Sequence, residues 1–186
     1  MSVREQTVGA YLEALASSAA VPGGGSAAAL ACAMGAALVA MVAKLSARKA
    51  REDSDRKLLE ALAPKLEALS ARLTDLSQQD IEAYRGVIEA KKARVPAERM
   101  QQAYRRAAEV PLETAEVAGE ALQLATQVSG RAWEMTASDL AVGSELLQTG
   151  RGGALGNVAI NLPDLEGEAA GQIERRYQEL RGQSER

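Results

Sequence analysis

The sequence contains no histidine, no phenylalanine and a single cysteine among its 186 residues. Without histidine, the chain cannot form a Ser-His-Asp triad, a histidine-ligated zinc site or an imidazole acid or base. One cysteine cannot form a disulfide within the chain. If the protein is an enzyme, its proton transfers therefore fall to Asp, Glu, Lys, Tyr or Cys side chains.

A strong charge of either sign is also missing. The formal net charge is −3, so the composition does not indicate a nucleic-acid-binding protein. Aromatic residues make up only 3%, whereas 47% of residues are apolar and 25% are charged, which is typical of a globular protein. The length predicts a single domain over residues 1–186, and the abundant alanine favours closely packed helices over sheets.

One uncharged run, Ala27–Ala43, is long enough to test as a membrane span. It would extend about 26 Å as a helix, but it is mostly alanine and glycine, so a buried helix of a soluble bundle is favoured. The N-terminal residues lack the continuous apolar stretch of a targeting signal, because Arg4, Glu5 and Glu13 interrupt it. We therefore expect a cytoplasmic protein without membrane attachment.

Apolar spacing predicts an all-α bundle of about six helices, with long antiparallel members. The first helix is expected from Val3 to Ala16. Three glycines within Val21–Ser26 disfavour helix, and Ser26 is the predicted N-cap of the apolar central helix that follows. A polar helix is expected over residues 164–181.

Proline and glycine set the other expected breaks. We expect Pro64 to kink a long helix or to mark its start, and Pro111 to kink or split the next one. Gly150, Gly152 and Gly153 are expected to interrupt or bend the chain.

Asp80 is the most informative acid. Leucines at positions 59, 62, 66, 69, 73 and 76 alternate steps of three and four, which is typical of a packed helical seam. The same stepping reaches Asp80, where an apolar residue is expected. Its structural interpretation is a buried polar pair or a drift in register that exposes it. Its functional interpretation is a proton-transfer or cation-binding carboxylate with a raised pKa.

Two helix starts offer further candidates. The glycine loop Gly23–Ser26 would let a ligand approach the backbone at a helix N-terminus, or would simply form a tight interhelical turn. It lacks the lysine and the preceding strand of a nucleotide P-loop. Asp139 lies beside Ser138 at another predicted helix start, where an acid is ordinary capping chemistry and also a candidate acid or base.

Three polar residues lie within otherwise apolar segments. Asn157 and Asn161 are four residues apart, so they share a helical face. They either cross-link helices or form hydrogen bonds with a ligand. Lys44 ends the central apolar run and either extends to solvent or meets an anionic ligand. Cys32 is expected to be a small core residue.

Several blocks, taken together, resemble the formiminotetrahydrofolate cyclodeaminase and methenyltetrahydrofolate cyclohydrolase family. They are residues 21–30 with 34–45, Asp80 with Ala83-Tyr84, Val110-Pro111-Leu112, Ala137-Ser138-Asp139-Leu140 and residues 156–161. The resemblance covers roughly residues 5–180. It implies an all-helical folate enzyme that acts on the N5,N10-methenyl bridge by cyclohydrolysis or cyclodeamination. It also implies a homodimer, with sites near the subunit interface, and a possible separate formiminotransferase partner.

The resemblance also suggests roles for the candidate residues. Asp80 and Asp139 would be the catalytic carboxylates, one as acid or base and one as cation or pterin partner. Asn157 and Asn161 would form hydrogen bonds with the polar edge of the pterin. The anionic glutamate tail would bind at Gly23, Gly24, Gly25 and Ser26, or at Lys44 and Arg48. We expect no metal, and no cofactor beyond the tetrahydrofolate substrate.

Two other classes of function remain open from the sequence. A catalytically silent helical scaffold would explain the leucine seam and the alanine-rich core without any site. A small-anion binder would use the glycine loop alone, and it would not need Asp80 or Asp139.

Overall fold

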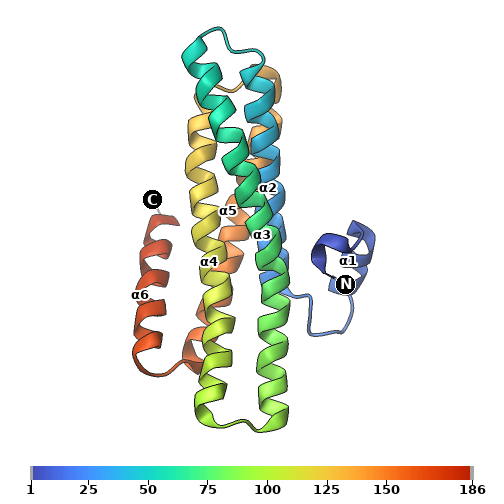
Figure 1. Cartoon of the computed structure of the whole chain (residues 1–186), viewed down its shortest axis with the longest axis vertical. Coiled ribbons are helices and arrows are strands. Elements are labelled where there is room, and N and C mark those ends of the chain that lie inside the picture. The colour runs from blue at the N-terminus through green and yellow to red at the C-terminus, as the bar shows by residue number, and fades with distance from the viewer. Residues whose placement is uncertain (1, 185–186) are drawn as a thin grey trace.

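The computed structural model describes residues 2–184 and shows them as an all-helical fold (Figure 1). The α-helices in this range are α1 (Val8–Leu15), α2 (Gly24–Ala47), α3 (Asp53–Ala93), α4 (Ala97–Ser129), α5 (Ala137–Asn161) and α6 (Gly167–Ser184). Short 3-10 helices lie at Val3–Glu5, Glu134–Thr136 and Leu162–Asp164. The predicted all-α bundle of six helices is confirmed.

Helices α2 to α5 form an antiparallel bundle in which each helix packs against its chain neighbours, and α5 returns to α2 (Figure 1). Helix α6 covers the outside of α4, whereas α1 stands apart on the other side. Two contacts show what lies beside the beginning of α2. Ser26 of α2 contacts Ser77 of α3, and Gly24 of α2 lies next to Asn157 of α5. The beginning of α2 therefore lies between the middle of α3 and the end of α5.

Helix α2 is the central helix. It is long and apolar enough to cross a membrane by length and composition, but 61% of its most apolar 18-residue window is buried inside the bundle. Its small residues let neighbouring backbones come close: a Cβ on Gly35 would lie 2.6 Å from the carbonyl oxygen of Gly143. The alanine and glycine of this helix therefore set the spacing of the bundle.

The two internal prolines do not divide their helices. Pro64 lies inside α3 and Pro111 lies inside α4, and both helices continue through them. Buried leucines on either side of Pro64, Leu62 and Leu66, hold the helix in the core, and this packing outweighs the lost backbone hydrogen bond.

The glycines of α5 do not interrupt it either, so the expected interruption is wrong, whereas the alternative of a bend stays a prediction. Gly150, Gly152 and Gly153 are all helical, because α5 is packed between α2 and α4 along its length. Gly150 is required by close packing: a Cβ there would lie 2.6 Å from the carbonyl oxygen of Ala28 and would also clash with Cys32.

Two predicted boundaries at the N-terminal side are also corrected. The first helix is split, because the side chain of Thr7 caps α1 by accepting a hydrogen bond from the Ala10 amide at 3.1 Å. The N-cap of α2 is Gly23 rather than Ser26, and Gly24 and Gly25 already belong to the helix. Ser26 uses its hydroxyl for contacts between helices instead.

The close contact between α2 and α5 can be tested with two neighbouring glycines. Gly150→Ala should lower the free energy of unfolding by about 2 kcal/mol or more, because the new methyl group overlaps α2. Gly152→Ala is the matched control, since its Cβ would meet nothing within 4 Å. It should leave stability unchanged or raise it by up to about 1 kcal/mol through helix propensity. Equal effects in urea unfolding would contradict this packing.

Candidate functional site

Asp80 of α3 lies against the first turn of α2. The backbone amide of Ser26 donates a hydrogen bond to its carboxylate. A Cβ on Gly25 would lie 2.7 Å from Cγ of Asp80, so the missing side chain at this position makes room for the carboxyl group. Asp80 therefore occupies the place of a capping acid at a helix N-terminus, although it comes from another helix.

The environment of Asp80 changes its acidity. Burial raises the pKa of Asp80 to about 6. The hydrogen bond from the Ser26 amide lowers this pKa, but its effect is smaller than that of burial. Within residues 2–184, no Lys or Arg forms an ion pair with this carboxylate. A carboxyl group with this pKa is mostly ionised at neutral pH, yet its protonated form is accessible, so it can both accept and donate protons.

A chain of buried hydroxyl groups supports the same turn of α2. The Ser26 hydroxyl lies 2.9 Å from the Tyr11 hydroxyl and 2.8 Å from the Ser77 hydroxyl. Both serines are fully buried, and Tyr11 is only 5% exposed. These bonds join α1, α2 and α3 directly beside Asp80, and thereby fix the backbone amide that binds its carboxylate.

Sequence reasoning missed Tyr11 and Ser77. Tyr11 lies on the apolar face of its helix, so its position in the sequence predicts an ordinary core residue. A signal was present for Ser77, which precedes Asp80 by three residues and therefore shares its helical face.

The two asparagines play different parts. Asn157 lies beside the same turn, where its Nδ2 would be 3.7 Å from a Cβ on Gly24, and it donates to the Gly153 carbonyl at 2.9 Å. Asn161 donates to the carbonyl oxygens of Ala107 at 3.2 Å and of Asn157 at 2.9 Å. Asn161 is thus a cross-link between α5 and α4, while Asn157 borders the glycine turn.

Lys44 and Asp139 lie far from this turn in one chain. Lys44 is twenty residues along α2 from Gly24, about 30 Å away, and forms an ion pair with Glu67. Asp139 is half-buried in the first turn of α5, about 27 Å along the helix from Asn157. A single chain therefore brings together Gly23–Ser26, Asp80 and Asn157 but not these two residues, whose roles remain predictions.

The family model described as formiminotransferase-cyclodeaminase matches residues 7–179. The chain belongs to this family. The match includes the glycine turn, Asp80 and Asn157, which are the parts of the formiminotransferase-cyclodeaminase domain that meet at the start of α2.

A solved structure shows the same fold. The crystal structure of formiminotetrahydrofolate cyclodeaminase from Thermotoga maritima superposes with a TM-score of 0.91 and has 24% sequence identity. The alignment covers 98% of this chain and 92% of that chain. No curated protein matches the sequence. The family and the fold are thus shown, and the reaction has to be argued from the site.

The charge state of Asp80 predicts how stability depends on pH. Its pKa is about 6 in the folded chain and about 4 when unfolded, so its contribution to stability is greatest below pH 4 and is lost as pH rises through 6. Asp80→Asn removes the loss of stability at high pH, because asparagine does not ionise. The variant should match the wild type at pH 4 and exceed its free energy of unfolding by about 2–3 kcal/mol at pH 8.

Urea unfolding of the two proteins between pH 4 and pH 8 measures this difference. A stability difference that does not change with pH would show that Asp80 has an ordinary pKa in the folded chain.

Proposed function

We propose that this chain is a folate one-carbon enzyme that acts on the N5,N10-methenyl bridge of tetrahydrofolate. Membership of the formiminotransferase-cyclodeaminase family supports the substrate class. The observation that carries the proposal is the half-buried Asp80 carboxylate, held by the Ser26 amide at the glycine-rich start of α2.

Two reactions that form or open the methenyl bridge both need a group that transfers a proton. In cyclodeamination, N10 attacks the formimino carbon on N5, and the tetrahedral intermediate expels ammonia to leave the methenyl cation. In cyclohydrolysis, water adds to the methenyl carbon, loses a proton, and the bond to N5 breaks to give the N10-formyl compound. Both reactions pass through a tetrahedral carbon and require a proton to move between the attacking and leaving groups.

In this proposal Asp80 moves that proton. As a carboxylate it accepts the proton of the attacking water or amine, and as a carboxylic acid it donates it to the leaving nitrogen. Its negative charge also stabilises the methenyl cation at close range. Gly24 and Gly25 leave the turn without side chains, so a flat ring can approach the carboxylate, and Asn157 lies beside the same turn to bind the polar edge of the pterin.

The proposal is tested with both folate substrates and followed by the absorbance of the methenyl compound. Formiminotetrahydrofolate that yields this band together with ammonia would make the protein a cyclodeaminase, which needs a formiminotransferase to supply its substrate. Faster loss of the band from methenyltetrahydrofolate, against a no-enzyme control, would make it a cyclohydrolase. No response to either substrate would leave the scaffold function.

Two variants test the role of Asp80 in the active reaction. Asp80→Asn should reduce turnover by about 100-fold or more, the usual contribution of a general acid or base. Gly25→Ala should also reduce it by at least about 10-fold, because the new methyl group displaces the carboxylate. Gly86→Ala is the control on α3, since its Cβ would meet nothing within 4 Å. Near-normal turnover in folded Asp80→Asn would refute the role.

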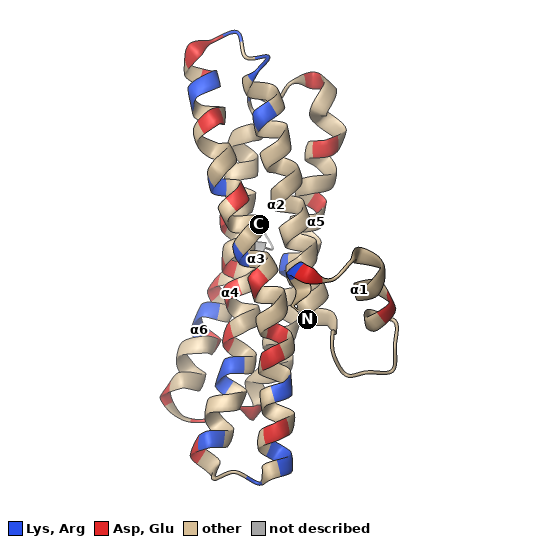
Figure 2. Cartoon of the chain, turned by 45° about the vertical axis from the view of Figure 1, so that its right-hand side comes forward, with Lys and Arg blue, Asp and Glu red and all other residues tan. Residues whose placement is uncertain are grey.

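We also propose that the active form is a homodimer that buries the outer face of α2 and α5. Lys44 is the only charged residue of α2, so that its ribbon is tan almost throughout in Figure 2. Met34, Met41 and Val142 are 52%, 38% and 49% exposed in one chain, which is unusual for large apolar side chains on one pair of helices.

Light scattering at micromolar concentration should give the mass of a dimer for the wild-type protein. Met34→Lys combined with Val142→Lys should give a helical monomer, because two charges would be buried in the interface. A monomeric wild type, or a double variant that remains dimeric, would overturn this arrangement.

A further inference from the structure

A groove of about 1260 Å³ runs between α4, α5 and the C-terminal end of α6. Leu122, Trp133 and Leu140 form apolar parts of its wall, and Arg151 of α5 lies among its lining residues. Arg151 is only 8% exposed. The groove therefore combines an apolar wall with a buried positive charge.

The guanidinium of Arg151 is poorly compensated. Its Nη2 donates to the carbonyl oxygen of Leu180 at 3.1 Å and to Oε1 of Gln183 at 3.3 Å, both neutral acceptors. Its Nε is buried and has no hydrogen-bond partner. Across residues 2–184, no carboxylate forms an ion pair with it. Burial lowers the pKa of Arg151, but a guanidinium remains charged, so the cost of burying this charge stands.

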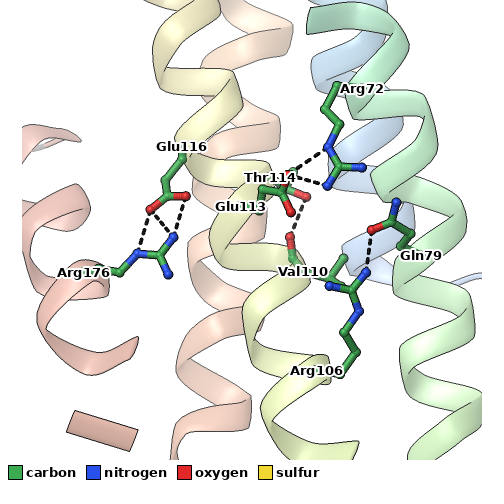
Figure 3. Close-up of polar contacts among 8 residues, drawn as sticks. All are labelled: Arg72, Gln79, Arg106, Val110, Glu113, Thr114, Glu116 and Arg176. Carbon is green, nitrogen blue, oxygen red and sulfur yellow. Dashed lines mark hydrogen bonds and ion pairs between the residues drawn. The ribbon is translucent and has the colours of Figure 1, made fainter. Parts of the chain in front are cut away.

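The acids that line the groove do not supply the missing partner. Glu116 is bound by Arg176 of α6, with Oε1–Nη2 and Oε2–Nη2 distances of 2.7 and 2.8 Å (Figure 3). Glu120 and Glu134 are exposed and form no ion pair with Arg151. Within residues 2–184, the positive charge of Arg151 in the groove lining is therefore not neutralised by an acid.

Beside Arg151, helix α4 presents bare backbone. A Cβ on Gly119 would lie 3.5 Å from Nε and 3.7 Å from Cζ of Arg151, so the backbone of α4 runs directly beside the guanidinium.

This groove is separate from the site at Asp80. Arg151 and Asn157 are six residues apart on α5, which places them about 120° apart around the helix axis and about 9 Å apart along it. Asn157 faces Gly24 of α2, whereas Arg151 faces Gly119 of α4 and the end of α6. A ligand at Arg151 would therefore not contact the carboxylate of Asp80.

We propose that the groove binds a small organic anion, with its carboxylate or phosphate group on Arg151 and its apolar part along the Leu122 and Leu140 wall. The anion supplies the negative charge that Arg151 lacks and offers oxygen atoms as hydrogen-bond acceptors. A guanidinium group binds a planar acid through two parallel hydrogen bonds. The inference does not depend on the proposed folate reaction, because none of these residues belongs to that site.

Thermal unfolding and NMR test the proposal with inorganic phosphate and glutarate as separate probes. At ten times its dissociation constant, the better probe should raise the Tm of the wild-type chain by about 3 °C or more. It should also shift the buried Nε–H signal of Arg151. A response to only one probe would tell a phosphate-type ligand from a carboxylate.

Matched variants separate this site from general salt effects. Arg151→Met should lose the anion response while keeping a Tm equal to or above that of the wild type, because an unpaired buried charge is gone. Arg176→Met removes an arginine of α6 that is paired with Glu116, and should keep the response. Arg151→Lys keeps the charge without the planar fork, and should bind at least about tenfold more weakly.

No shift of the Nε–H signal with either probe would overturn the proposal. So would an equal rise in Tm in the wild type and Arg151→Met, which would reflect the general stabilising effect of such anions.

Discussion

The absence of a side chain at Gly25 is the constraint on which the candidate site depends. The carboxylate of Asp80 fills the space that a Cβ would take, and it accepts the amide of the next residue, Ser26. The same use of small residues continues along α2, where Gly150 and Gly143 of α5 come close to its backbone. One alanine- and glycine-rich helix thus sets both the spacing of the bundle and the position of its acid.

Among residues 2–184, Asp80 and Arg151 are both largely buried without an ion pair, and they meet the cost of a buried charge in different ways. Asp80 responds to burial by a raised pKa, so part of its cost is relieved by taking up a proton. Arg151 has no such option, because a guanidinium does not deprotonate in proteins. An acid that exchanges protons suits chemistry, whereas a fixed charge suits binding of an opposite charge. Under the two proposals, each cost falls at a place where a bound ligand would recover stability.

Much of this fold follows from the sequence. The leucine steps and the missing strand pattern predict the bundle, and the apolar run predicts that α2 is central. The same steps single out Asp80, because an acid stands where the seam requires an apolar residue. The continuity of α5 through its glycines does not follow from the sequence, because helix propensity is local, whereas Gly150 packs against Cys32 and Ala28 of α2.

The remaining parts of the site depend on pairing between helices, which spacing along one helix does not show. The Ser26 hydroxyl meets Tyr11 and Ser77 only because α1 and α3 dock against the same turn. The distance of Lys44 and Asp139 from Asp80 likewise follows from helix length once the antiparallel order is known. Arg151 gives no sequence signal, because only the packing of α4 and α6 shows that no acid within residues 2–184 forms an ion pair with it.

The central claim is that Asp80 is held in a proton-exchanging state at the start of α2. A carbon-13 NMR titration of the aspartate carboxyl groups measures this directly, with Asp80→Asn used to assign the signal. The account predicts that Asp80 titrates near pH 6, about two units above an exposed aspartate. Titration near pH 4 would contradict it, because the protonated form of Asp80 would then be scarcely populated at neutral pH.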